Sequence, residues 1–419
     1  MSLSATTFVS RSWEQILRQL TTLPHLSSAS SSQTLLFSLS PAPDLPQDAL
    51  SALVRILTQQ PGAIGCLSAP LRPRGAALTP TVCSVAALDG ARATPFRSTL
   101  PGKEPTQVGR WHAFRKRDDR APLEPLPQEA QGVDWEAVWA KQAAPPPLPA
   151  ELRALGPEDV QAVLYFSDSA PEGLVQALSR FEKASKLGLI ASSTPFITGR
   201  PHTLFYGSDV HSTGAVGIAL TSNDAAKPKL EVQFPELSAI EDKLFTVTDT
   251  EGNMVNALDD QNPSRIILSA VEKLNGKPTP TNVDLGIKED EFFLGVHRDG
   301  KLYQLYTIQG GDPSRGTIAL QSDAAPETGS QVKIYRKSVN PDMKNRLREG
   351  LNLITALPEG SMDLGGNGSD DDHVTVLQGS FLATSENGFV VSRARDGEPC
   401  ERPWNSTVVG GHATIDWDH

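Results

Sequence analysis

Short apolar runs separated by turn residues occupy most of this chain of 419 residues, and their spacing limits what it can fold into. Three such runs lie at 187–191, 203–206 and 215–220, and the turns between them contain Gly199 and Gly207. This alternation predicts three consecutive strands at the centre of one sheet. No catalytic motif lies within these runs.

Two segments predict strand–helix–strand units. In 34–67, a strand at 34–38 precedes apolar residues at helical spacing over 48–59, and a second strand follows at 63–67. Residues 158–191 have the same order, and they end in GLIASSTP where the first segment ends in GCLSAP. Such units are typical of an α/β layer, and their likeness suggests a weak internal duplication.

Asp-Gly pairs at 89–90 and 299–300 predict hairpin turns, because both central positions of a type I′ turn require positive φ. The first pair would join strands at 81–88 and 91–96, which excludes a purely parallel, doubly wound sheet.

The second half of the chain also alternates strands and turns, with predicted helices at 263–274 and 341–356. The fold class is therefore α/β to mixed α+β. We expect two halves with mixed, largely antiparallel sheets flanked by helices.

The first 33 residues have two interpretations. Arg11 and Arg18, many hydroxyl side chains and the single acid Glu14 are typical of a mitochondrial transit peptide. A folded first helix explains the same residues, because Ser12 and Gln15 predict a capping box. The apolar residues of this helix share one stripe: Phe8, Val9, Trp13, Ile16, Leu17 and Leu20. We favour the helix and a cytoplasmic location, with a mitochondrial location as the alternative.

Proline interrupts the pattern over 118–157, where its density is incompatible with a sheet ladder or a long helix. A short helix at 134–141 would place Trp135 and Trp139 on one face, either on the protein's own surface or against a partner. The sequence predicts four parts. Residues 1–120 form the first half, 121–157 are a proline-rich insertion or linker, 158–235 continue the first half and contain the central strands, and 236–419 form the second half.

Charge and cysteine content exclude several classes of function. A formal net charge of −11 disfavours binding to nucleic acid or to anionic membrane surfaces. The cysteines Cys66, Cys83 and Cys400 form no Cys-x-x-Cys pair, which is typical of a reducing compartment and predicts no zinc site. No apolar run approaches the length of about 18 residues that a membrane span needs.

Motifs for catalysis or metal binding are not recognisable. The glycine-rich segment 310–316 lacks the ending of a phosphate loop, and the acidic segment 365–372 lacks the alternation of a calcium loop. The eight histidines show no helical metal-binding spacing, although His202 and His211 flank one predicted strand and turn. We therefore expect no cofactor and no metal, and favour a non-catalytic protein.

Hydroxyl groups in predicted turns are the candidates for a binding site. Ser192, Ser193 and Thr194 follow one strand, and Cys66 and Ser68 follow the equivalent strand of the first unit. These residues would line a cleft between the halves, where ligands commonly bind. Simple turn chemistry is the alternative.

A single cation next to this turn completes the candidate site. Arg200 would meet an acidic group of the ligand, such as a carboxylate.

The segment Gly188–Leu220 resembles the junction between the two halves of the FIST domain, where a small-residue turn precedes a strand like G-V-V-G-V-A-L. Leu244–Leu274 is similar to the segment that opens the C-terminal half of that domain. Pro263-Ser264 stands where the family has Pro-Ala, and Asp259 or Asp260 where it has Asp-Gly. The resemblance covers 10–120 and 155–415.

This resemblance implies a sensory module of the kind found in bacterial signalling proteins and some eukaryotic F-box proteins. It implies a small, amino acid-like ligand between the halves, and a haem role would fall to His211. The alternatives are a protein-interaction scaffold related to F-box receptors, although 1–33 holds no F-box, and thirdly an enzyme. The C-terminal Cys-x-Gly-Arg-like element of the family is replaced here by residues 378–381.

Overall fold

The computed structural model describes residues 4–27, 33–71, 78–102, 146–221, 228–275, 292–312, 316–322, 324–337, 345–356, 362–363, 373–395 and 400–416. The fold is mixed α+β and rich in strands, with several mixed sheets and few helices, which confirms the predicted class. The predicted helix at 134–141 lies outside these residues, as does most of the proline-rich segment.

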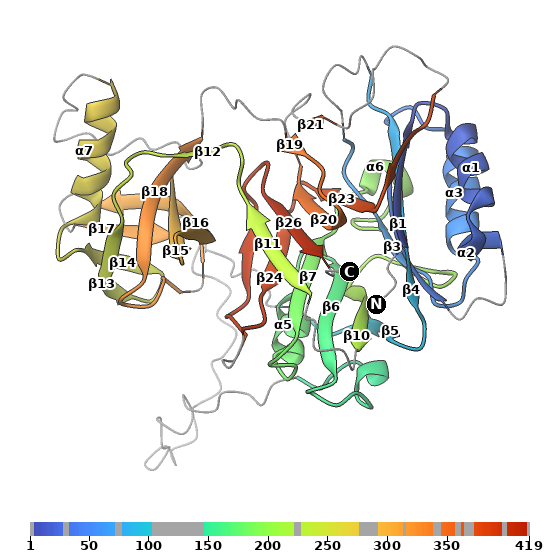
Figure 1. Ribbon diagram of the computed structural model, residues 1–419, viewed down its shortest axis with the longest axis horizontal. Helices are drawn as coiled ribbons and strands as arrows, with labels where there is room; N and C mark the ends of the chain where they lie inside the picture. The colour runs from blue at the N-terminus through green and yellow to red at the C-terminus, as the bar shows by residue number, and fades with distance from the viewer. Residues whose placement is uncertain are drawn as a thin grey trace, which may run out of the picture.

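The first layer is a seven-stranded sheet covered on its outer face by helices, which lie at the right of Figure 1. In spatial order its strands are β22 (Thr375–Gln378), β1 (Ser4–Ser10), β4 (Thr81–Asp89), β2 (Gln33–Ser40), β3 (Ile64–Leu67), β8 (Leu204–Tyr206) and β9 (Asp209–His211). The helices are α1 (Trp13–Thr22), α2 (Pro24–Ser27) and α3 (Gln47–Leu57). Apolar residues of these helices, such as Leu53 and Leu57 of α3, share a core with residues of the sheet such as Phe37 of β2.

The second layer is a six-stranded sheet that packs its inner face against the first layer. Its strands, in spatial order, are β25 (Trp404–Ser406), β24 (Phe389–Ser392), β7 (Ser185–Ile190), β6 (Val160–Ser167), β10 (Ala215–Thr221) and β5 (Ala93–Ser98). Its outer face is covered by α5 (Glu172–Leu178), and the connections include η1 (Ala150–Leu152) and α6 (Pro195–Thr198). Leu36 and Leu164 belong to the core between the two layers, so the order is helix, sheet, sheet, helix.

The two layers have the same strand arrangement, which agrees with the duplication that the sequence suggests. The spatial orders β1-β4-β2-β3-β8 and β5-β10-β6-β7-β24 match position by position. In each, the third and fourth strands are the parallel pair, joined by a helix. Phe37 on β2 lies opposite Gly65 on β3, and Tyr165 on β6 lies opposite Gly188 on β7. Each unit therefore places an aromatic ring over a glycine beneath its helix.

The C-terminal strands return to the layers built by the first half of the chain. A four-stranded sheet holds β11 (Lys229–Gln233), β26 (His412–Asp416), β20 (Gly350–Thr355) and β23 (Ser380–Ser385). β22 joins the first layer beside β1, and β24 joins the second beside β7. Sheet membership thus crosses residue 236, the sequence boundary between the halves.

The segment that follows β11 forms a separate antiparallel unit, at the left of Figure 1. Its strands are β12 (Leu237–Ala239), β18 (Gln331–Lys337), β13 (Phe245–Glu251), β14 (Met254–Leu258), β17 (Thr317–Leu320), β16 (Lys301–Asp312) and β15 (Phe292–Arg298). Because β18 also pairs with β15, six of these strands close into a ring around their own core. Helix α7 (Pro263–Asn275) packs against it, and a short parallel pair, β19 (Asn345–Arg346) and β21 (Met362–Asp363), lies outside it.

Two turn predictions had opposite outcomes. The hairpin at 299–300 is confirmed, since Asp299 and Gly300 have φ of 51° and 74° between the paired strands β15 and β16. The hairpin at 89–90 is wrong. β4 already has β1 and β2 as neighbours, so the chain turns at Asp89 and crosses to the second layer, where β5 pairs with β10.

Three other expectations are also corrected. The predicted helix at 341–356 is wrong in its second part, where β20 lies between two neighbouring strands and is buried on both faces, so its apolar residues have no helical stripe. The runs 187–191 and 203–206 fall in different layers, as β7 and β8. Phe8 belongs to strand β1, although Ser12 caps the following helix as predicted by accepting the Gln15 N–H at 3.4 Å.

Adding a methyl group at Gly188 tests the contact between ring and glycine. A Cβ there would overlap the buried Tyr165 ring, and a Cβ at Gly65 would overlap Phe37. We expect Gly188→Ala and Gly65→Ala each to lower the free energy of unfolding by about 1–3 kcal/mol, as measured by urea denaturation. Gly310→Ala is the matched control, because a Cβ there meets no atom within 4 Å. Equal stability of all three variants would contradict the interpretation.

Candidate functional site

The predicted hydroxyl residues converge on the end of strand β23. Ser192 Oγ donates to the Thr384 carbonyl at 3.3 Å, and the Ala69 N–H, next to Ser68, donates to the same oxygen at 2.8 Å. Ser68 Oγ accepts from Ser38 at 2.8 Å. Both small-residue turns therefore bond to the same residue of β23, Thr384.

The remaining predicted residues separate into buried and exposed groups. Thr194 is buried and donates to the Arg200 carbonyl at 3.0 Å, whereas the Ser193 N–H donates to the Glu386 carboxylate at 2.7 Å. Cys66 is fully buried, and burial raises the pKa of its thiol. The Arg200 guanidinium lies on the surface and donates to Ser212 Oγ at 2.9 Å. The Arg200 guanidinium thus bonds to a residue outside the predicted site.

The two histidines of the central stretch have separate surroundings. His202 is buried, with Nδ1 at 3.2 Å from the Ser192 carbonyl. His211 lies on edge strand β9, where burial, followed by the positive charge of Arg97, lowers its pKa. Among the described residues, no group of three or more His, Cys, Asp or Glu side chains is placed to hold a metal ion.

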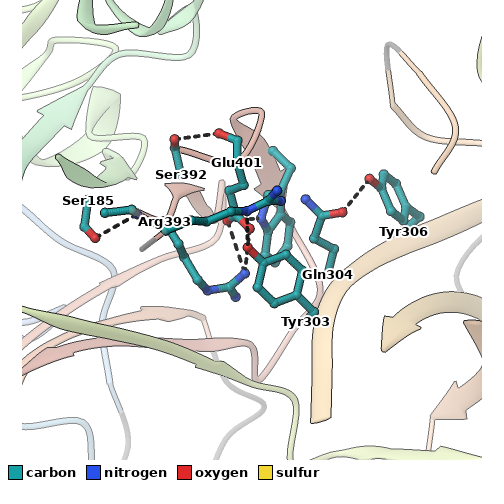
Figure 2. Close-up of polar contacts among 10 residues, drawn as sticks. Ser185, Tyr303, Gln304, Tyr306, Ser392, Arg393 and Glu401 are labelled. Carbon is teal, nitrogen blue, oxygen red and sulfur yellow. Dashed lines mark hydrogen bonds and ion pairs between the residues drawn. The ribbon is translucent and has the colours of Figure 1, made fainter. Parts of the chain in front are cut away.

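A cluster of charged and aromatic side chains that the sequence did not indicate lies where the closed ring meets the second layer (Figure 2). We call it the Tyr303 cluster. Its members are Tyr303 and Arg298 from the hairpin of β15 and β16, Arg393 and Arg395 after β24, Glu401 before β25, and Trp404 on β25. It therefore draws residues from two structural units.

Glu401 is the buried anion of the Tyr303 cluster. Its carboxylate accepts from Arg393 Nη1 at 2.9 and 3.1 Å and from Trp404 Nε1 at 2.9 Å. The Tyr303 hydroxyl also hydrogen-bonds it, and burial together with this carboxylate raises the pKa of Tyr303. A buried carboxylate with charged and neutral donors around it is satisfied rather than strained.

Guanidinium groups surround the Tyr303 ring. The Cζ atoms of Arg393, Arg395 and Arg298 lie 4.3, 5.7 and 5.8 Å from the ring centroid, within the range of cation–π contacts. Arg395 Nε also donates to the Tyr303 hydroxyl at 3.3 Å. In the part of the chain that the structure describes, one carboxylate, Glu401, bonds to the Tyr303 hydroxyl. The cluster thus brings three arginines and one glutamate to a single tyrosine, and Arg298 and Arg395 each make further interactions.

Local backbone pairing explains how the sequence builds this cluster. Ser392 Oγ donates to the Glu401 carbonyl at 2.8 Å, and the Glu401 N–H donates to the Arg393 carbonyl at 3.0 Å. These bonds hold the two ends of the segment 393–401 together. In the sequence this segment is polar and contains no recognisable motif. Its charged residues carry no periodic signal, and only the fold brings them to Tyr303.

A second buried polar network lies inside the four-stranded sheet. His412 Nε2 donates to Asn352 Oδ1 at 2.8 Å, and Thr414 Oγ1 donates to the same atom at 3.0 Å. The Asn352 amide donates in turn to the carbonyls of Arg348, Gly350 and Phe381. Burial, with a smaller effect of Arg348, lowers the pKa of His412 to about 4. This network is structural, because its polar atoms bond to one another.

Comparisons with known proteins add no family to this picture. No protein-family model matches the chain, and no curated protein matches its sequence. No helix in the described ranges combines the length and the apolar character that crossing a membrane requires.

Breaking the buried ion pair tests how the Tyr303 cluster is held. Arg393→Met leaves Glu401 buried without its charged partner, so we expect the free energy of unfolding to fall by about 3–5 kcal/mol in chemical denaturation. The double variant Arg393→Met/Glu401→Gln should recover part of this loss, because no unpaired charge remains. A double variant as unstable as the single one would argue against the ion-pair account.

Acid titration tests the burial of His412. Between pH 6.5 and pH 4 the unfolded chain takes up a proton on this imidazole, whereas the folded chain does not, so stability falls as pH falls. We expect His412 to remove about 3 kcal/mol between pH 7 and pH 4, measured as urea midpoints at several pH values. The variant His412→Gln should show a shallower fall over this range. An unchanged slope would show that His412 is not the group responsible.

Proposed function

We propose that this chain is a FIST-type sensory module that binds a small, anionic, amino acid-like ligand at the Tyr303 cluster. The observation that carries the proposal is the concentration of guanidinium groups around one tyrosine ring, where two structural units meet. The resemblance of 188–220 and 244–274 to the FIST domain supports the sensory role. The proposed function is non-catalytic.

The chemistry of the cluster favours a carboxylate. Guanidinium groups bind carboxylates through paired, charge-assisted hydrogen bonds. Arg393 pairs with Glu401. Arg298 is exposed and Arg395 is partly exposed beside the Tyr303 hydroxyl, and both make further interactions of their own. A carboxylate approaching from solvent would reach these two arginines by virtue of their exposure and would compete with their existing interactions, while the ring would limit its orientation.

The location of the cluster gives a route from binding to signalling. Tyr303 belongs to the closed ring, and Arg395 follows a strand of the second layer. A ligand that contacts both would shift the equilibrium between arrangements of the two units. A partner protein that prefers one arrangement would then bind differently. The sequence-derived site at 192–194 offers less, because Ser192 and Thr194 are buried and bonded internally.

A protein-interaction role is the second candidate, and Phe196 favours it. Its side chain is fully exposed on α6, while Thr194 and Gly199 hold the backbone of that turn through hydrogen bonds to Pro201 and Pro195. An exposed aromatic side chain is a common anchor at protein interfaces, and here the backbone that carries it is held by hydrogen bonds. Arg200, which follows α6 and is also exposed, would contact an acidic partner.

Ligand-dependent thermal melting tests the proposed function. We expect stabilisation by amino acids or small dicarboxylates, of about 2.7 kcal/mol at 100 times the dissociation constant, and none by the matching uncharged amides. Arg395→Ala should weaken binding at least about tenfold, or about 1.4 kcal/mol. Arg180→Ala, an exposed arginine on the helix side of the second layer, should leave it unchanged.

The same panel separates the alternatives. Loss of binding in Arg200→Ala, with Arg395→Ala unaffected, would move the site to the turn at 192–200. A panel without any shift would contradict the ligand-binding proposal and favour the interaction role. Nucleotides and haem belong in the panel, because stabilisation by haem that is lost in His211→Ala would indicate a haem sensor.

A further inference from the structure

A lysine and a cysteine meet inside the second layer, at a place that the proposed ligand site does not use. Lys186 Nζ lies 3.0 Å from Cys400 Sγ. The Lys186 side chain lies on β7 between β6 and β24, and the residue is 4% exposed. We propose that Lys186 and Cys400 form a covalent bridge when the protein is exposed to peroxide. In this bridge one oxygen atom links the lysine nitrogen to the cysteine sulfur.

The surroundings of Lys186 direct its ammonium group at the sulfur. Its other two hydrogen bonds go to the carbonyls of Phe181 at 2.8 Å and Ala184 at 3.2 Å. In the part of the chain that the structure describes, no carboxylate forms an ion pair with it. Burying an ammonium group without an anion is costly, so the sulfur is the partner whose chemistry matters here.

Cys400 differs from the other two cysteines in its access to solvent. Cys66 and Cys83 are fully buried, and burial raises the pKa of both thiols, that of Cys83 to about 12. Cys400 is partly exposed and has a cationic neighbour. Reactive cysteines typically lie in such partly exposed, electropositive surroundings, whereas buried structural cysteines are inert.

Both groups are held in place, so the distance between them is maintained. Lys186 is paired with Val163 and Ser392 in the sheet. The Cys400 N–H donates to the Glu182 carbonyl at 3.0 Å, and the next residue is the buried Glu401. A void of about 10 Å³ borders Lys186, which is room for about one water-sized molecule. The nitrogen and the sulfur, 3.0 Å apart, are thus held close enough for one bridging oxygen atom to join them.

The reaction balances with hydrogen peroxide as the oxidant. Peroxide first oxidises the thiol to a sulfenic acid and releases water, a known first step of cysteine oxidation. A second peroxide then oxidises the sulfenic acid and the lysine nitrogen together. The O–N bond forms, the sulfenic O–H bond, two lysine N–H bonds and the peroxide O–O bond break, and two molecules of water and one proton are released. In total, one thiol, one ammonium group and two molecules of hydrogen peroxide give one S–O–N bridge, three molecules of water and one proton. Sulfur and nitrogen are oxidised, and peroxide is reduced.

Peptide mapping by mass spectrometry after peroxide treatment of the full chain tests this proposal. The expected product joins the peptides of Lys186 and Cys400, with a mass gain of one oxygen and a loss of two hydrogens. Excess dithiothreitol should reverse it, and Lys186 should resist amine labelling after denaturation until it is reduced. Cys400→Ser and Lys186→Met should each abolish the joined peptide, while Cys83→Ala should retain it.

Several products would overturn the proposal. Oxygen on the sulfur alone, with Lys186 fully labelled, would show simple oxidation of Cys400. A linked product that has lost two hydrogens and gained no oxygen would show a direct S–N bond instead. Unmodified Cys400 would show that peroxide does not reach the sulfur. Because each is detected in the unmutated chain, the test does not depend on the folding of any variant.

Discussion

An aromatic ring that lies over a glycine on a parallel neighbouring strand is the contact on which both layers depend. Phe37 over Gly65 and Tyr165 over Gly188 occupy equivalent positions, each beneath the helix that joins the two strands. A side chain at either glycine would displace the ring from the core that the helix covers. The repeated contact fixes the register of each parallel pair, and the remaining strands then add by antiparallel pairing.

Strands from the C-terminal part of the chain hold these two layers together. Thr384 accepts from the turn at Ala69, Ser385 donates to the Ile190 carbonyl, and both belong to β23. These hydroxyl and carbonyl groups bond where both strand–helix–strand units end. The small residues of those turns are therefore explained by the close approach of a third strand, and the cores of both layers are continuous with it.

Local features of this fold could be predicted from the sequence, and its long-range pairings could not. The helix at 47–57 is indicated by apolar residues at helical spacing. The turn at Asp299-Gly300 is indicated by the Asp-Gly pair itself, whose two residues both have positive φ in the structure. The hairpin expected at Asp89 failed because strand partners are chosen among residues far apart in sequence. The strand at 350–355 was mistaken for a helix because a strand buried on both faces has no alternation. Arg393 and Tyr303 are likewise far apart in the sequence, so no local pattern could predict that they meet.

The described residues between Ser385 and Trp404 contact both the second layer and the Tyr303 cluster, and this has a consequence for their polar groups. They supply β24 to the second layer, Arg393 and Glu401 to the Tyr303 cluster, and Cys400 to the buried Lys186. A change in bonding at Cys400 alters the segment one residue from Glu401, whose carboxylate binds Arg393, Trp404 and Tyr303. Since coupling between two sites is reciprocal, a ligand that contacts the Tyr303 cluster would also change the environment of Lys186 and Cys400. Two chemically different inputs, a small anion and an oxidant, would thus act on the same short stretch of backbone, whose strand β25 contacts β16 of the closed ring.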